Sequence, residues 1–152
     1  MGAKDYTELD CWQLSDRMRC LVSDILSDSA FRRDPELRGQ LESAAESPCP
    51  NIAEGFARFQ PRDFARFLRI AKGSQAEVIE RLARAVAKKL VTKERVAEAA
   101  EFARRAKGAT TRLIVYLETA EPPNQRRRRG QRTRNPEPRN QHPEPGTPEP
   151  GT

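Results

Sequence analysis

The sequence is poor in the side chains that most often carry chemistry. Aromatic residues make up 6% of the 152 residues, and there are one histidine and three cysteines. The histidine, His142, stands in a proline-rich C-terminal stretch, so the usual proton shuttle of a catalytic site is missing. Cys11, Cys20 and Cys49 have no C-x-x-C spacing, and no glycine-rich phosphate loop is present. We therefore expect no catalytic residue, metal ligand, cofactor or small-molecule substrate.

Long apolar runs are also absent. No segment approaches the roughly 20 apolar residues that a membrane span needs. The N-terminus opens with charged residues rather than with the apolar run of a signal peptide. Cysteines without a pairing pattern are typical of free thiols in a reducing compartment. These features predict a cytoplasmic protein with no membrane contact.

The C-terminal stretch lacks core-forming residues altogether. From Pro122 onward there is no Val, Ile, Leu, Met, Phe, Trp or Tyr, and Pro-Glu-Pro repeats follow a run of four arginines. Such a segment has nothing to bury, and dense proline favours an extended chain. We expect a bundle over residues 1–121 and a disordered, basic, Pro- and Arg-rich tail over residues 122–152. A basic arm of this kind either attracts polyanions or serves only to keep the chain in solution.

What the rest of the sequence does contain is helical periodicity. Apolar residues recur at i, i+3, i+4 and i+7, and no alternating strand pattern competes. The first helix is expected over about Glu8–Ser29, opened by a capping box formed by Thr7 and Asp10. Asp34-Pro35-Glu36 is a start signal for the second helix, because Asp caps helices and Pro favours their first position.

Prolines and short links define the remaining helices. Pro48 and Pro50 interrupt the second helix and predict a kink there. A third helix is expected from about Pro61 to Leu90, and Thr92 is expected to cap a fourth. Short links make successive helices antiparallel neighbours, which predicts an all-α fold, an antiparallel up-down-up-down four-helix bundle. The residues expected in its core are, helix by helix, Cys11, Leu14, Met18, Leu21, Val22 and Ile25; Leu37, Leu41, Ala44, Ala45, Pro48, Ile52 and Phe56; Phe64, Phe67, Leu68, Ala71, Val78, Leu82 and Val86; and Val96, Ala99, Ala103, Ala106, Thr110, Leu113 and Leu117.

Two polar, glycine-containing segments stand inside these helices: Ser47-Pro-Cys-Pro-Asn-Ile-Ala-Glu-Gly55 and Gly73-Ser-Gln-Ala-Glu77. An interior Gly costs a helix about 1 kcal/mol relative to Ala, so both glycines need a structural reason. We expect Gly73 to let another backbone approach closely. Asn51 and Glu54 are expected to hydrogen-bond across to the third helix, and the alternative makes them a binding or catalytic pair. The residues interpreted as this structural signature are Ser47, Asn51, Glu54, Gly55, Gly73 and Ser74.

Together these segments resemble the four-helix bundle proteins encoded in 23S rRNA intervening sequences, and more distantly the accessory variability proteins of diversity-generating retroelements. The resemblance covers roughly Leu9–Leu117, and its most specific part is the run Asn-Ile-Ala-Glu-Gly at residues 51–55. It implies a four-helix bundle that assembles into ring-like homopentamers. The first group is encoded within ribosomal RNA genes and the second partners a reverse transcriptase. The resemblance therefore also implies RNA or a nucleic-acid-handling protein as a partner, although the family has no settled biochemical activity.

Two further sets of side chains are candidates for contacts with partners. One set is basic and is expected to contact phosphates, with a solvated mixed-charge face as the alternative. The other set is apolar and lies off the core stripes of the first and fourth helices, where Phe102, Ala109 and Tyr116 repeat every seven residues. Exposed apolar side chains often mark interfaces, and scattered surface aromatics are the alternative. The basic set is Arg62, Arg66, Arg69, Arg126, Arg127, Arg128 and Arg129, and the expected oligomer interface is Trp12, Leu26, Phe102 and Tyr116.

The sequence therefore predicts a non-enzymatic oligomeric scaffold that associates with RNA or with a nucleic-acid-handling protein. A protein-only assembly module with no nucleic-acid contact is the alternative. A small enzyme ranks last, because no pairing of a nucleophile with a base is visible.

Overall fold

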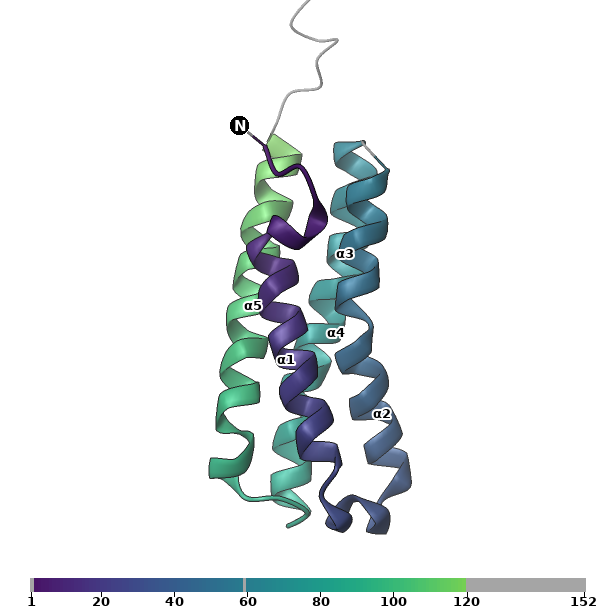
Figure 1. Ribbon diagram of the computed structural model, residues 1–152, viewed down its shortest axis with the longest axis vertical. Coiled ribbons are helices and arrows are strands. Elements are labelled where there is room, and N and C mark those ends of the chain that lie inside the picture. Colours follow the sequence, from purple (N-terminus) through teal and green to yellow (C-terminus); the bar gives the residue numbers. More distant parts are fainter. Residues whose placement is uncertain (1, 59, 120–152) are drawn as a thin grey trace, which may run out of the picture. The chain divides into compact units, whose positions relative to one another are not determined.

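The computed structural model of the protein describes residues 2–58 and 60–119, and these residues are all helical or in links between helices. Helices α1 (Asp10–Leu26), α4 (Pro61–Ala87) and α5 (Lys93–Thr119) lie side by side with the pair α2 (Pro35–Glu46) and α3 (Pro48–Ala57), and the chain reverses direction at each link (Figure 1). The predicted all-α fold with four helices is confirmed. The predicted disordered tail over residues 122–152 lies outside the described residues. The elements are η1 (Tyr6–Glu8), α1 (Asp10–Leu26), η2 (Ser29–Arg33), α2 (Pro35–Glu46), α3 (Pro48–Ala57), α4 (Pro61–Ala87) and α5 (Lys93–Thr119).

The first helix is shorter than predicted, and the predicted capping box at Thr7 is wrong. Leu9 is the N-cap of α1 and supplies no side-chain hydrogen bond. Thr7 instead donates its hydroxyl to Asp5 Oδ1 at 2.6 Å, and its amide also donates to Asp5. Asp and Thr side chains readily form such local bonds with residues two positions away, and this one caps η1 rather than α1.

The predicted start and interruption of the second helix are confirmed. Asp34 accepts a hydrogen bond from the Leu37 amide at 3.0 Å, and Pro35 occupies the first turn. The helix divides at Ser47 into α2 and α3, because Pro48 and Pro50 have no amide hydrogen to donate to the preceding turn. A continuous helix is therefore replaced by two shorter ones that together form one rod of the bundle (Figure 1).

The core consists of two apolar clusters. One contains Met18, Phe31 and Leu82, and the other contains Ile52 and Leu68. Most of the predicted core residues are buried, whereas a minority, at the rim, are only half-buried. Helix α5 differs from the other helices because its buried side chains are mainly small. They are Val96, Ala99, Ala103, Ala106, Ala109, Thr110 and Ile114.

A buried polar layer separates the two clusters. Gln75 of α4 is fully buried, and its Nε2 donates to Ser15 Oγ of α1 and to Thr110 Oγ1 of α5, both at 2.9 Å. The two hydroxyl groups donate in turn to backbone carbonyls of their own helices, at Cys11 and Ala106. Each amide hydrogen of Gln75 thus has an acceptor. Its carbonyl oxygen Oε1 has no hydrogen-bond partner in the part of the chain that the structure describes.

The two glycines of the polar segments have opposite environments. A Cβ added to Gly55 would lie 2.6 Å from Phe64 Cδ2 and 2.9 Å from Phe67 Cβ, so Gly55 allows α3 to approach α4. At Gly73 a Cβ would meet no atom within 4 Å, and the residue is exposed. The expectation that Gly73 admits a neighbouring backbone is therefore wrong within the described bundle, because Gly73 lies on the outer side of α4.

These environments predict opposite effects of the same substitution. Gly55→Ala is expected to lower the free energy of unfolding by about 1–3 kcal/mol, because overpacking forces the phenylalanines to move. Gly73→Ala is the matched control and is expected to raise it by about 0.5–1 kcal/mol, because Ala is the better helix former. Urea unfolding followed by circular dichroism measures both. Equal effects of the two variants would contradict the close packing at Gly55.

The polar layer predicts coupling between α4 and α5. Thr110→Val keeps the shape of the side chain but leaves one buried amide hydrogen of Gln75 without an acceptor, which is expected to cost about 1–3 kcal/mol. In a Gln75→Leu background the same change is expected to cost much less, because no amide hydrogen then needs that acceptor. A double-mutant cycle by urea unfolding measures the difference, and simple additivity would show that the hydrogen bond carries no coupling.

Candidate functional site

The polar signature lies where α2 and α3 pass α4, but only part of it joins the two helices. Ser74 of α4 donates its hydroxyl to Ser47 Oγ at 2.8 Å, so these two serines link the helices. Asn51 does not cross to α4. Its Nδ2 donates to Ser47 O at 2.8 Å and to Ser47 Oγ at 3.2 Å, and the prediction for Asn51 is therefore wrong. Ser47 lies one helical turn before Asn51, so its carbonyl and hydroxyl are within reach of the Asn51 side chain.

Glu54 also stays on its own helix, contrary to the prediction. Its carboxylate accepts from Arg58 Nε at 2.8 Å, and both side chains are about half exposed to solvent. An i, i+4 partner on the same helix face is closer than any group on α4. Arg58 then lies 5.5 Å from the centroid of the Phe67 ring, so Glu54 reaches α4 only through this arginine. An exposed ion pair of this kind provides no buried acid or base.

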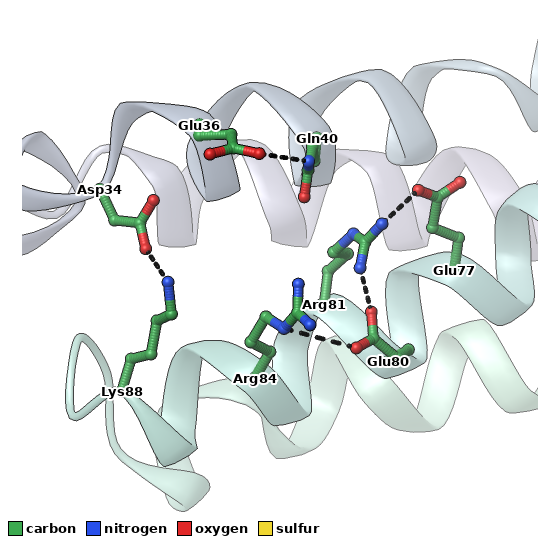
Figure 2. Close-up of polar contacts among 8 residues, drawn as sticks. All are labelled: Asp34, Glu36, Gln40, Glu77, Glu80, Arg81, Arg84 and Lys88. Atoms are coloured by element: carbon green, nitrogen blue, oxygen red, sulfur yellow. Dashed lines mark hydrogen bonds and ion pairs between the residues drawn. The ribbon is translucent and has the colours of Figure 1, made fainter.

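Farther along, α4 carries a set of ion pairs that neutralise its basic residues. Figure 2 shows Arg81 between Glu77 and Glu80, and Lys88 reaching Asp34 at the start of α2. The hydrogen bond from Lys88 holds the pKa of the Asp34 carboxyl below its ordinary value. Because these cations have carboxylate partners, this part of α4 does not continue the basic surface formed by the arginines nearer its N-terminus.

The predicted basic strip on α4 is exposed but is partly neutralised. Arg62, Arg66 and Arg69 all lie at the surface. Arg69 forms an ion pair with Glu118 of α5, whereas Arg62 and Arg66 form none within residues 2–58 and 60–119. The other four arginines of the predicted set, at positions 126–129, lie outside the described residues.

The residues predicted to form an oligomer interface do not share one environment. Leu26 is only 5% exposed and packs in the same cluster as Phe31, so the expectation that it lies outside the core is wrong. The turn η2 carries Phe31 back over this end of α1, which the helical spacing alone does not reveal. Trp12 is half-buried and meets Tyr6 edge to face, with 5.5 Å between ring centroids. Tyr116 remains 67% exposed.

The predicted apolar seam on α5, formed by Phe102, Ala109 and Tyr116, is broken at its middle residue. Ala109 is buried, at 6% exposure, so Phe102, Ala109 and Tyr116 do not form a continuous exposed stripe. The stripe fails because α5 is covered by α1 on one side, and Ala109 lies on that covered side, in the cluster that contains Cys11. Phe102 is half-buried and lies beside the guanidinium groups of Arg17 and Arg105.

Sequence reasoning missed three residues of interest. Gln75 stands within the second polar segment, but its burial depends on partners 60 and 35 positions away in the chain. Arg105 and Arg112 are both exposed on α5 and are spaced by seven residues. This spacing is the same signal that drew attention to Arg62 and Arg69, so the sequence alone could have found them.

Two negative findings hold for the described residues. No three His, Cys, Asp or Glu side chains come together there in an arrangement that could hold a metal ion. None of the described helices combines the length and the apolar composition of a membrane span.

A search of curated proteins finds none that matches the chain. A family model described as 23S rRNA-intervening sequence protein matches residues 7–111, which is 105 of the 152 residues and extends from η1 into α5. The chain therefore belongs to the 23S rRNA-intervening sequence protein family.

Proposed function

We propose that this protein is a non-enzymatic, cytoplasmic, oligomeric scaffold that associates with RNA. The observation that carries the proposal is the combination of exposed apolar side chains on α5 with two exposed arginines on α4, Arg62 and Arg66, that form no ion pair within residues 2–58 and 60–119. The first feature suits contacts between copies, and the second suits contacts with phosphates. A scaffold that docks only a nucleic-acid-handling protein is the second candidate, and the resemblance to retroelement accessory proteins favours it.

Self-association is supported by the second half of α5. Val115 and Tyr116 are 54% and 67% exposed, which is unusual for neighbouring large apolar residues. A monomer would leave both in water, whereas burial between copies would remove that apolar area from solvent. The resemblance to ring-forming relatives favours a homopentamer. The buried Leu26 has no part in this interface.

The thiols support a non-enzymatic role. Burial raises the pKa of Cys11 to about 11 and that of Cys49 to about 12. Both groups are therefore protonated at neutral pH, and a thiol is a far weaker nucleophile than a thiolate. Cys20 is exposed.

The apolar pair on α5 gives a test of assembly. Light scattering of the full-length chain is expected to show the mass of a pentamer. Val115→Ser combined with Tyr116→Ser is expected to shift the population towards monomer, because assembly of this variant would bury less apolar area. Ala97→Ser changes an exposed residue of the same helix and is expected to leave the mass unchanged. A wild-type chain that stays monomeric at every concentration would exclude the oligomeric scaffold.

The basic strip on α4 gives a test of RNA association. We expect the full-length chain to retain labelled RNA at low salt. Arg62→Gln combined with Arg66→Gln is expected to reduce the slope of log binding constant against log salt by about 0.7 for each phosphate that the variant no longer neutralises. Arg84→Gln combined with Arg95→Gln removes the same charge from arginines that have carboxylate partners, and should change the slope little.

Two outcomes of this test would count against RNA. Absence of retention by the wild-type chain at low salt would exclude the proposal. A protein partner that copurifies and survives nuclease digestion would support the protein-directed scaffold instead.

A further inference from the structure

A groove of about 730 Å³ runs between α1 and α5 and is lined by residues of these two helices alone. Leu14 and Phe102 supply apolar surface, and Arg105 and Arg112 supply positive charge. Gly108 also lines the groove, and a Cβ added there would lie 3.6 Å from Arg112 Nη1. A neighbouring hollow of about 400 Å³ shares Asp10 and Arg112 with the groove and is also lined by Glu8. The volume of the groove falls in the roughly 300–1,000 Å³ range of ligand sites.

The unbalanced charge of this groove is positive. Glu101 accepts from Arg104 at 3.0 Å, which neutralises that pair. Asp10 lies in the first turn of α1, where the helix N-terminus stabilises a negative charge. Arg105 and Arg112 form no ion pair with any residue that the structure describes. Within the described residues neither guanidinium group thus has a carboxylate partner, and phosphate suits the fork of an arginine.

Phe102 adds a flat apolar surface to the lining of this groove. The guanidinium carbon of Arg105 lies 5.0 Å from the centroid of the Phe102 ring, and that of Arg17 lies 5.9 Å from it. The Phe102 ring thus already contacts planar guanidinium groups. Arg105 lines the groove and is exposed, whereas Arg17 does not line it, so a base that stacks on the ring from the groove replaces the guanidinium of Arg105. Moving this surface side chain towards a phosphate leaves the core undisturbed. Stacking of a base on an aromatic ring is stronger than an exposed cation–π contact.

We propose that the groove between α1 and α5 binds single-stranded RNA, with phosphates on Arg105 and Arg112 and one base stacked on Phe102. The inference rests on the proposed association with RNA and names a second contact site and the form of the nucleic acid. A duplex keeps the faces of its bases covered, so it offers Phe102 nothing to stack. An unpaired strand offers both the base and a flexible phosphate backbone.

The first arm of the test measures the phosphate contacts. Binding of a fluorescein-labelled oligo(A) strand to the full-length chain is followed by anisotropy over a range of salt concentrations. Arg105→Gln combined with Arg112→Gln is expected to reduce the salt slope by about 1.4, which is about 0.7 for each of two phosphates. The control is Arg84→Gln combined with Arg95→Gln, which removes equal charge and should leave the slope near that of the wild type.

The second arm measures stacking. Phe102→Leu keeps an apolar side chain but removes the ring, and is expected to weaken binding of the single strand about tenfold. Binding of a duplex of the same length should not change. Circular dichroism checks that Phe102→Leu is folded. If it is not, the Arg105→Gln and Arg112→Gln variant alone tests the proposal, because these two arginine side chains lie at the surface.

The outcomes separate this inference from the proposed function. If the wild-type chain binds oligo(A), but the Arg105 and Arg112 variant keeps the full salt slope, the groove site is excluded and RNA association stands. Equal weakening of single strand and duplex by Phe102→Leu would exclude base stacking. If the wild-type chain binds no RNA, the proposed function and this inference fail together.

Discussion

The hydrogen bonds from Gln75 to Ser15 and Thr110 are the constraint on which the arrangement of the helices depends. The buried face of α5 is made mostly of alanines, and such a smooth surface gives a neighbouring helix few side chains to interlock with. Apolar burial alone changes little when a smooth helix slides along its axis. A buried hydrogen bond with one donor and one acceptor is satisfied only in a single register, so the polar layer fixes where α5 stands against α4.

Features encoded within a few residues could be predicted from the sequence. The start at Asp34 and Pro35 and the break at Pro48 and Pro50 depend on local backbone chemistry, and both are confirmed. The predicted cap at Thr7 is wrong because two local hydrogen-bond patterns compete there and Thr7 bonds to Asp5 instead. The burial of Gln75 could not be predicted, because helical spacing indicates which face of a helix a residue occupies but not which hydroxyl groups of other helices lie opposite it.

The candidate site shows the same limit. Gly55 and Gly73 look alike in the sequence, yet one lies against two phenylalanines and the other faces open space. Asn51 and Glu54 were expected to reach across to α4, but partners one turn away on the same rod are nearer. The exposure of Arg62, Arg66 and Arg69 followed directly from helical periodicity. Whether an arginine is neutralised depends instead on the neighbouring helix, as the pairing of Arg69 with Glu118 shows.

The division of the second rod has a mechanical consequence. Pro48 and Pro50 carry no amide hydrogen, so the carbonyl oxygens of Ala44 and Glu46 lack the donors that an unbroken helix supplies. Bending α1, α4 or α5 stretches ladder bonds at every position, whereas α2 and α3 have fewer such bonds to strain at their junction. The junction at Ser47 is therefore the place where bending this rod strains the fewest backbone hydrogen bonds.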